Sequence, residues 1–308
     1  MINQITDTIL MVRPRHFGFN EETAANNAFQ VNDQSITKEQ ISEKAIEEFD
    51  NFVTKLRMHG VDVIVAEDSE TPIKTDSIFP NNWVTFHQDG TIILYPMNSL
   101  NRRLERSKDV LNTVLEKHHH RLSIDLSKVE EEELFLEGTG SLILDRPNGL
   151  AYACVSPRTN EEILDIFCKK MDYQKILFSS SDQNGQLIYH TNVMMALAEN
   201  FVIICMESID REEDRDLLIK KFGQTGKEVI SINYAQMYAF AGNMLQVKNR
   251  IGETFLVMSE QAFKSLDKEQ IHAIQRHTSI LHSPIYTIEK YGGGSARCMM
   301  AEVFLPRK

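Results

Sequence analysis

The chain has 308 residues and a formal net charge of −11, and hydrophobic residues make up 42% of it, an ordinary composition for a globular protein. Nucleic acids and anionic membrane surfaces bind basic patches, so the acidic balance argues against both as partners. An apolar run such as Phe201–Met206 is far shorter than the roughly 20 residues of a membrane helix. The four cysteines lie far apart without a C-x-x-C pair. This spacing predicts neither a zinc site nor a disulfide framework, and it fits a reducing cytoplasm.

The first predicted elements are a strand, a long helix and a second strand. Thr8–Arg13 is a short apolar segment that we expect to be a strand. Ile36–Gly60 carries apolar residues at helical spacing and ends in a glycine, which is typical of a helix and its C-terminal cap. Val61–Ala66 follows as the next predicted strand.

Four pairs of apolar stretches, each joined by a short polar segment, predict β-hairpins. Asp89-Gly90 and Asn148-Gly149 are the strongest signals, because a type I′ turn requires positive φ at both central positions. The paired strands are Trp83–His87 with Thr91–Pro96, Ser141–Asp145 with Leu150–Val155, Val193–Ala198 with Phe201–Met206, and Met244–Lys248 with Thr254–Met258.

Each hairpin is followed by a helical pattern and then by another short strand. The apolar residues of these segments recur close to the helical period of 3.6. The predicted helices are Leu104–His118, Glu161–Lys170, Arg211–Phe222 and Gln261–Thr278. The strands predicted after them are Leu122–Asp125, Lys175–Ser179, Glu228–Asn233 and Ser283–Ile288.

The strand–strand–helix–strand unit recurs along the chain. The units start at Asn82, Gly138, His190, Gly242 and Arg297, which are 56, 52, 52 and 55 residues apart, and a period just above fifty indicates a propeller or a solenoid. The fifth copy, Cys298–Leu305, lacks a following strand unless Thr8–Arg13 supplies it, which would close a ring without sheet edges. We therefore predict a five-bladed α/β propeller (five ββαβ repeats around a pseudo-fivefold axis) as a single domain over residues 1–308. An open α+β sandwich with chance spacing is the alternative.

Corresponding loops of such a ring gather at one end of its axis, so the segments before the first strands should form the functional site. A thiolate beside a histidine that is oriented by a carboxylate is the arrangement of covalent acyl-type catalysis. The segments supply a carboxylate, an imidazole, a thiol and several amides, namely Glu137, His190, Cys298, Asn82, Asn192 and Asn243.

Cys298 is the candidate nucleophile among the four cysteines. It follows a glycine-rich loop and Arg297, and a neighbouring guanidinium favours the thiolate. Cys154 and Cys205 lie inside apolar strands, and Cys168 lies on the apolar side of a helix, so we expect these three to be buried and inert.

Three strings resemble the catalytic segments of a known superfamily. They are E-G-T-G (Glu137–Gly140), H-x-N (His190–Asn192) and G-G-G-S-A-R-C (Gly292–Cys298). The resemblance is to the guanidino-group-modifying superfamily, which includes arginine deiminase, dimethylarginine dimethylaminohydrolase and the amidinotransferases, all five-bladed propellers. It covers nearly the whole chain, and Val12–Gln30 with Phe79–Trp83 is most similar to the citrulline-utilisation hydrolase group. The resemblance implies that Cys298 attacks the central carbon, His190 is the general acid and base, and Glu137 orients it.

Two asparagines stand where the family's arginine-binding members carry aspartates that grip the guanidinium. At Asn82 and Asn192 an amide supplies no charge for a permanent cation with five donors and no acceptor. Losing two charged hydrogen bonds should weaken the binding free energy of a guanidinium by about 3 kcal/mol. A neutral ureido group, with one carbonyl and N–H donors, complements the amides. We therefore predict a cysteine-dependent hydrolase of a ureido carbon, with citrulline first, yielding ornithine, ammonia and CO2 through an S-carbamoyl intermediate.

The α-carboxylate of an amino-acid substrate needs a cation, and a guanidinium binds it through two hydrogen bonds. Arg158 in S-P-R-T-N and Arg103 in N-R-R-L-E resemble arginine-bearing stretches of the family, with surface salt bridges as the alternative. Arg13 is a further candidate, and Asn243 is a candidate for polarising the ureido oxygen.

Two other functions stay open. One is arginine deiminase or amidinotransferase activity on a guanidino group, and the other is a non-catalytic binding protein of the same fold. No metal or other cofactor is expected, because the chain has no H-E-x-x-H and His118–His120 ends a charged helix. The expected partner is a small amino acid and the expected location is the cytoplasm, while a homo-oligomer is left open.

Overall fold

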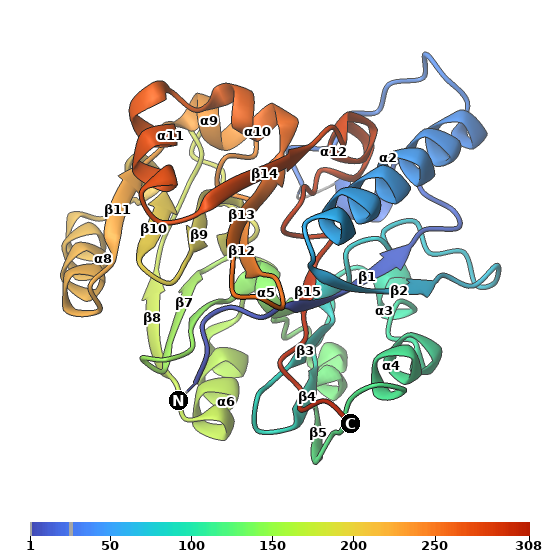
Figure 1. Cartoon of the computed structure of the whole chain (residues 1–308), viewed down its shortest axis with the longest axis horizontal. Coiled ribbons are helices and arrows are strands. Elements are labelled where there is room, and N and C mark those ends of the chain that lie inside the picture. Colours follow the sequence, from blue (N-terminus) through green and yellow to red (C-terminus); the bar gives the residue numbers. More distant parts are fainter. Residues whose placement is uncertain (1, 25–26) are drawn as a thin grey trace.

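The computed structural model describes residues 2–24 and 27–308. Its strands form five three-stranded sheets, ordered β15-β1-β2, β3-β4-β5, β6-β7-β8, β11-β10-β9 and β12-β13-β14. In each sheet the middle strand runs antiparallel to one neighbour and parallel to the other. The parallel pairs need a crossover connection, and helices supply it (Figure 1). The five predicted strand–strand–helix–strand units are therefore present.

The strands are β1 (Thr8–Arg13), β2 (Asp62–Glu67), β3 (Val84–Phe86), β4 (Thr91–Leu94), β5 (Leu122–Asp125), β6 (Ile143–Asp145), β7 (Leu150–Cys154), β8 (Gln174–Phe178), β9 (Met195–Leu197), β10 (Phe201–Ile204), β11 (Glu228–Ser231), β12 (Leu245–Lys248), β13 (Thr254–Ser259), β14 (Ser279–Ser283) and β15 (Ala301–Glu302). The α-helices are α1 (Glu21–Ala24), α2 (Lys38–Met58), α3 (Leu100–Arg103), α4 (Lys108–Leu115), α5 (Gly138–Ser141), α6 (Glu161–Met171), α7 (Thr191–Met194), α8 (Glu212–Gln224), α9 (Tyr234–Tyr238), α10 (Glu260–Ser265), α11 (Lys268–Gln275) and α12 (Tyr286–Gly292). Three 3₁₀ segments are η1 (Pro80–Asn82), η2 (Ser127–Glu132) and η3 (Met206–Ser208).

The fifth sheet joins the two ends of the chain, as predicted. Strand β15 pairs antiparallel with β1, with Ile9 opposite Glu302 and Leu10 opposite Ala301. Strand β2 then pairs parallel with β1, after the long helix α2. The residues just before β15, including Cys298, are thereby fixed against an N-terminal strand nearly 300 positions away in the sequence.

The first strand of several units is shorter than predicted, because a helical turn occupies its start. The turns α5 and α7 end at Ser141 and Met194, inside the predicted strands, whereas η1 ends at Asn82, just before the predicted strand from Trp83. The predicted strand Ser283–Ile288 is wrong. Strand β14 ends at Ser283, and helix α12 follows from Tyr286.

The hairpin turns also differ from the prediction. Gly90 and Gly149 have positive φ, whereas Asp89 and Asn148 do not, so neither turn is type I′. The links contain four residues rather than two, and the N–H of Gly90 donates to the carbonyl of His87.

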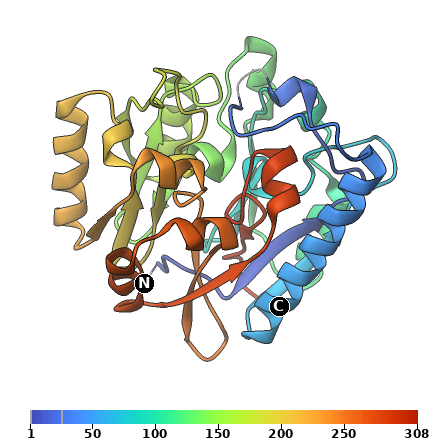
Figure 2. The same ribbon diagram turned by 90° about the horizontal axis from the view of Figure 1, so that it is seen from above.

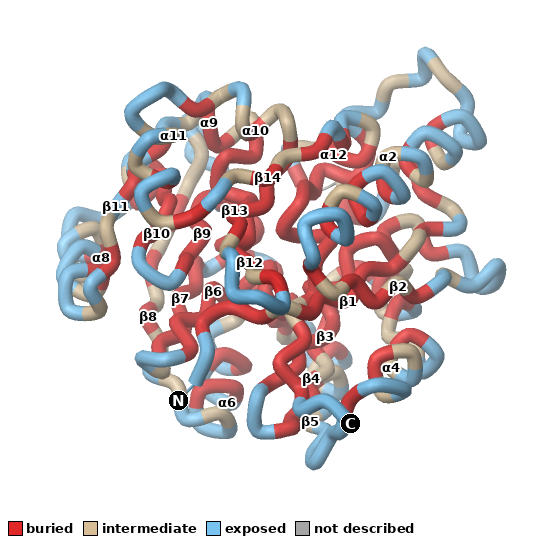
Figure 3. The backbone as a smooth tube through the Cα atoms, viewed as in Figure 1, coloured by how far each residue is buried: buried red, intermediate tan, exposed pale blue. Residues whose placement is uncertain are grey.

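The long helices lie outside the sheets (Figures 1 and 2). In Figure 3 the buried segments gather in the strands, while the outward sides of α2 and α8 are exposed. Helix α2 buries Phe49, Phe52 and Leu56 completely, and these side chains share a core cluster with residues of β13 and with Cys298. No helix in the described parts of the chain is long and apolar enough to cross a membrane.

Truncating the buried face of α2 should destabilise the protein. We expect Phe49→Ala to lower the free energy of unfolding by about 3–5 kcal/mol, because Phe49 is completely buried and its loss leaves a cavity. Met58→Ala on the same helix is the control, since Met58 is 80% exposed, and it should change stability by less than about 0.5 kcal/mol. Urea unfolding measures both; equal effects would contradict the assigned packing of α2.

Candidate active site

The Cys298 thiol lies against two asparagine amides. Its Sγ accepts hydrogen bonds from Nδ2 of Asn243 at 3.2 Å and Nδ2 of Asn192 at 3.4 Å. Asn243 Nδ2 also donates to the carbonyl of Asn192 at 3.0 Å, and Asn243 Oδ1 accepts from the Cys298 N–H at 3.4 Å. These amide N–H groups therefore fix the position of the sulfur. The other three cysteines are buried, and burial raises the pKa of Cys154, Cys168 and Cys205 to about 11.

The loop that carries Cys298 is held from both sides. The Tyr189 hydroxyl donates to the carbonyl of Gly293 at 2.8 Å, and Ser295 Oγ donates to the buried carboxylate of Glu289 at 2.6 Å. Gly293 has φ +62°, which favours glycine, and a Cβ on Gly294 would lie 2.9 Å from the Phe79 ring. The glycines are therefore required by close packing as well as by backbone conformation.

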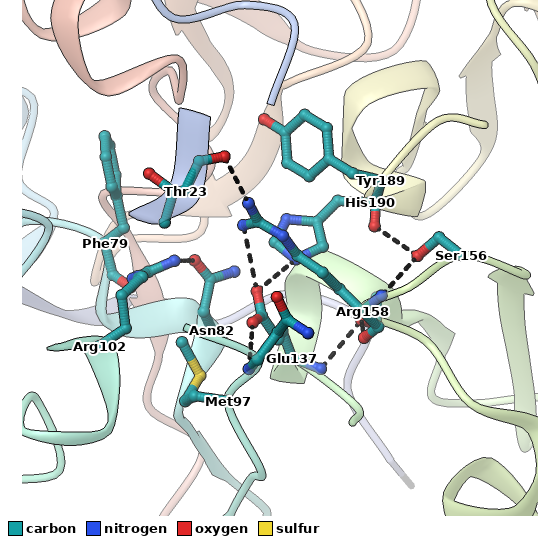
Figure 4. A network of polar contacts seen from close by, with 12 residues as sticks. Thr23, Phe79, Asn82, Met97, Arg102, Glu137, Ser156, Arg158, Tyr189 and His190 are labelled. Atoms are coloured by element: carbon teal, nitrogen blue, oxygen red, sulfur yellow. Dashed lines mark hydrogen bonds and ion pairs between the residues drawn. The ribbon is translucent and has the colours of Figure 1, made fainter. Parts of the chain in front are cut away.

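His190 and Glu137 form a buried pair at the starts of α7 and α5 (Figure 4). His190 Nε2 lies 2.8 Å from Glu137 Oε2, and Glu137 Oε1 accepts from the N–H of Asn98 at 2.9 Å. A Cβ on Gly140 would lie only 2.8 Å from the His190 ring, so the glycine leaves room for the imidazole.

The protonation states follow from burial and from the neighbouring charges. Burial lowers the pKa of His190 to about 4, although Glu137 opposes this. Burial alone would raise the pKa of Glu137, but Arg158 and the hydrogen bond from His190 outweigh it and hold that pKa below its ordinary value. At neutral pH the imidazole is therefore neutral and the carboxylate ionised. Because a carboxylate only accepts hydrogen bonds, Nε2 carries the proton and Nδ1 is the basic nitrogen.

Two buried arginines flank this pair (Figure 4). Arg158 Nη1 lies 3.5 Å from Glu137 Oε2, its Nη2 donates to the carbonyl of Thr23, and its guanidinium stacks 4.9 Å above the Tyr189 ring. Arg102 forms two 2.9 Å hydrogen bonds with the carboxylate of Glu105.

Arg102 joins two further residues to this group. Its Nη1 donates to Asn82 Oδ1 at 2.9 Å, and its Nε lies 3.7 Å from Asp76 Oδ2. Burial raises the pKa of Asp76 and raises that of Glu105 to about 7, although Arg102 opposes both shifts.

Three buried polar atoms around this centre have no hydrogen-bond partner among the described residues. They are Asp76 Oδ1, Asn82 Nδ2 and Asn192 Oδ1. Buried polar groups are rarely left unpaired, because each costs about 1–3 kcal/mol. These atoms are two acceptors and one donor, and they are available to a bound molecule.

One small cavity connects these groups. It is lined by Thr23, Asn27, Asp76, Phe79, Asn82, Arg102, Arg158, Tyr189, His190, Gly292, Gly293, Gly294 and Cys298, and its volume is about 20 Å³. A water molecule needs about 10–15 Å³ by this measure, so an amino acid enters only if the surrounding segments move. Within residues 2–24 and 27–308, no group of three or more His, Cys, Asp or Glu residues is arranged to hold a metal ion.

Most of the residues expected at the site are brought together there. Cys298, Asn192 and Asn243 are in contact, and so are Glu137, His190 and Arg158. Asn82 lines the same cavity but bonds Arg102 rather than sulfur.

Two predicted arginines lie elsewhere. Arg103 does not line the cavity; it bonds the carbonyl of Met97, with its Nε 3.5 Å from Glu130. Arg13 is partly exposed and pairs with Asp50 and Glu67. Both make the salt bridges that were the alternative expectation.

Arg297 makes its hydrogen bonds away from the thiol, to the carbonyl of Met300 and the carboxylate of Glu302, and it interacts with Cys298 through its charge. The prediction also missed Arg102 and Asp76. One signal favoured Arg102 over Arg103. Glu105 lies three residues after Arg102, and residues three apart on a helical turn face each other.

Comparison with protein families identifies the chain. The model of the family described as eukaryotic N,N dimethylarginine dimethylhydrolase matches residues 13–305. The chain belongs to this family. Membership places it in the guanidino-group-modifying superfamily and confirms the prediction of a hydrolase acting on carbon–nitrogen bonds other than peptide bonds. A comparison with curated sequences found no significant match.

Solved structures share the fold of this dimethylhydrolase-family chain. The arginine dihydrolase ArgZ of cyanobacteria superposes with a TM-score of 0.75 at 15% identity, covering 97% of this chain and 41% of ArgZ. AgrE in complex with L-arginine gives 0.75 at 17% identity, covering 98% of this chain and 40% of AgrE. A dimethylarginine dimethylaminohydrolase adduct with S-methyl-L-thiocitrulline superposes with a TM-score of 0.65 at 14% identity, covering 97% of this chain and 99% of that protein. This chain thus spans about two fifths of ArgZ and AgrE.

The buried neutral imidazole predicts an acid-sensitive fold. The pKa of His190 is about 4 in the folded protein and 6.5 ordinarily, so the unfolded chain binds this proton more readily. The resulting stability is complete above pH 6.5 and is lost as the pH falls towards 4, by about 3 kcal/mol in all. Urea unfolding at each pH should show a shallower slope for His190→Gln over this range. The exposed His119→Gln serves as the control. Identical slopes for wild type and His190→Gln would contradict the assignment.

Proposed function

We propose that this protein hydrolyses the guanidino group of arginine to ornithine, two molecules of ammonia and CO2, with citrulline as the bound intermediate. The observation that carries the proposal is the position of the Cys298 thiol. It is hydrogen-bonded by two neutral amides and opens on a cavity that is also lined by His190, Arg102 and Arg158. Glu137 is hydrogen-bonded to His190 behind this lining. Nucleophile, base and substrate-binding charges thus share one closed space.

In the proposed reaction Cys298 forms a covalent intermediate. Its sulfur bonds to the central guanidino carbon, and the thiol proton moves to Nδ1 of His190. The imidazolium formed is stabilised by Glu137 and gives its proton to the departing ammonia. Water, deprotonated by His190, then displaces the sulfur and leaves a ureido group.

A second cycle on the ureido group completes the reaction. The sulfur bonds to the ureido carbon, and the alkyl nitrogen departs as the amine of ornithine. Hydrolysis of the S-carbamoyl enzyme gives carbamate, which decays to ammonia and CO2. Two water molecules are consumed overall.

The charge of the site favours arginine as the first substrate. The interacting buried side chains carry three carboxylates, on Asp76, Glu105 and Glu137, against the two guanidiniums of Arg102 and Arg158. Arginine has a net charge of +1 and citrulline has none, so only arginine balances this excess. The structural relatives point the same way, since ArgZ is an arginine dihydrolase and AgrE binds L-arginine.

The two asparagines support the second cycle. The free N–H of Asn82 and the free carbonyl of Asn192 match the oxygen and the N–H groups of a ureido group. Citrulline, which the sequence predicted as the substrate, therefore keeps a place in the scheme as the intermediate that the amides retain.

Three other residues that line the cavity suit the α-amino-acid group. Arg102 and Arg158 supply cations for the carboxylate, and the unpartnered Oδ1 of Asp76 supplies an acceptor for the ammonium. This arrangement requires a free amino acid rather than a residue within a peptide.

We also interpret the five sheets as the blades of one closed propeller domain. Strand β6 contacts β9, β9 contacts β12, and β15 contacts β3, while Phe86 bridges to Val303. These contacts link neighbouring sheets, as adjacent blades of a ring require.

Product analysis tests the proposed reaction. Purified protein given arginine should release ornithine and ammonia in a ratio of about one to two, with citrulline as a minor product, because the same thiol serves both cycles. Cys298→Ser should lower turnover by at least about a thousandfold, and Cys205→Ser is the matched control. Arginine converted only to citrulline would refute the second cycle, and turnover of citrulline or N,N-dimethylarginine alone would refute arginine as the substrate.

The neighbouring arginines Arg102 and Arg103 give a matched pair for the carboxylate contact. Arg102→Lys keeps the charge but loses the paired hydrogen bonds that a guanidinium forms with a substrate carboxylate. We therefore expect KM for arginine to rise about tenfold or more. Arg103→Lys should leave KM within about twofold, because Arg103 bonds Met97 and Glu130 outside the cavity. Steady-state kinetics of both variants provides the test. A larger rise in KM for Arg103→Lys than for Arg102→Lys would contradict the placement of Arg102 at the substrate carboxylate.

A further inference from the structure

A second cavity lies at the other ends of the strands that carry the active-site residues. Asn82, Glu137 and Cys298 come before β3, β6 and β15. The residues that follow the same strands, His87, Arg146 and Phe304, line a separate cavity of about 370 Å³. Ligand pockets usually measure about 300–1,000 Å³, so this one is large enough for a small organic molecule. None of its lining residues lines the active-site cavity.

The cavity contains a buried guanidinium with weak partners. Arg146 is 5% exposed, and its Nη1 lies 3.4 Å from His87 Nδ1. Its Nη2 lies 3.7 Å from Glu302 Oε2, its guanidinium stacks 4.1 Å above the Phe304 ring, and the Tyr173 hydroxyl also interacts with it. A buried arginine normally forms short hydrogen bonds to a carboxylate. Among the described residues, no carboxylate oxygen lies within 3.5 Å of the Arg146 guanidinium.

The positive charge of Arg146 is not fully balanced by the carboxylate of Glu302. Glu302 is the carboxylate that Arg146 approaches, and it already bonds Arg297 Nη2 at 2.8 Å. Two buried guanidiniums thus share one carboxylate. His87 adds no negative charge and is itself neutral, since burial, together with Arg146, lowers its pKa to about 3. Asp89 at the rim pairs with Arg121.

The walls of the cavity are mainly apolar and aromatic. Ile2, Met171, Tyr173 and Phe304 line it, with Asn3 and Gln88 adding polar groups. A molecule bound here would meet one guanidinium and a hydroxyl at the floor and hydrophobic surface at the sides. A single charge suits one unbalanced cation, and the nearby carboxylates of Asp89 and Glu302 disfavour a dianion such as phosphate.

We propose that this cavity is a binding site for a small monocarboxylate with an apolar or aromatic body, whose carboxylate pairs with Arg146. With a ligand carboxylate paired to Arg146, Glu302 would pair with Arg297 alone. Arg297 is the residue that precedes Cys298. The site is independent of the reaction proposed above, because it uses none of the same side chains.

Methionine-methyl NMR with benzoate as the probe tests the site directly. Met171 lines the cavity, and its methyl resonance, assigned with Met171→Leu, should shift saturably on addition of benzoate. The methyl group of Met58, which is 80% exposed, should not move. Benzamide has the same shape without the charge, and we expect it to bind at least about tenfold more weakly because a charged hydrogen bond is lost. Arg146→Gln should abolish the shift.

The alternative outcomes each overturn the proposal. No shift of Met171, or equal shifts with benzoate and benzamide, would show that no carboxylate site exists. An unchanged benzoate titration in Arg146→Gln would remove the guanidinium from it. If that variant does not fold, the comparison of benzoate with benzamide on the wild-type protein decides. Tighter binding of phenyl phosphate than of benzoate would refute the monocarboxylate assignment.

Discussion

The burial of five charged side chains is the constraint on which the rest of the site depends. Ions taken out of water are costly unless close partners compensate them, and removing one partner of such a pair costs about 3–5 kcal/mol. Glu137 has compensation from both Arg158 and His190, while Arg102 is shared between Glu105 and Asp76. The carboxylates outnumber the guanidiniums by one, and a cationic molecule can supply the missing charge.

Neutral amides rather than charges surround the sulfur within this arrangement. Asn192 and Asn243 donate to Cys298 without adding net charge, so they hold the sulfur in place and remain compatible with either a charged or an uncharged substrate group. Asn82 is oriented by Arg102, which takes its carbonyl oxygen and leaves its N–H group free. The amide positions therefore decide orientation, and the more distant carboxylates decide the preferred charge.

The sequence predicts the architecture well because the repeat is carried by local patterns. Strands such as Thr8–Arg13 and Leu122–Asp125 have the predicted bounds, and the spacing of the units correctly indicated that Cys298, His190 and Glu137 converge. The turn before β9 was not predictable from periodicity, because Val193 and Met194 are apolar and suit either a strand or a helix. The choice between Arg102 and Arg103 depends on which face of a single helical turn meets the cavity, and the i,i+3 spacing of Arg102 and Glu105 was the available signal. Asp76, which also approaches Arg102, belongs to no recognised motif. The second cavity could not be predicted from the sequence either, because Arg146 follows a hairpin strand, as many surface charges do.

Calorimetric proton counting on the Cys298→Ala variant tests the charge argument most directly. Burial raises the pKa of Glu105 to about 7 and raises that of Asp76, so Glu105 is partly protonated at neutral pH when the site is empty. A cationic ligand lowers both pKa values and expels protons. Titrations in buffers of different ionisation enthalpy should show that arginine binding releases about half a proton to one proton, whereas citrulline binds more weakly and releases none. Tighter binding of citrulline, or proton uptake with arginine, would contradict the account.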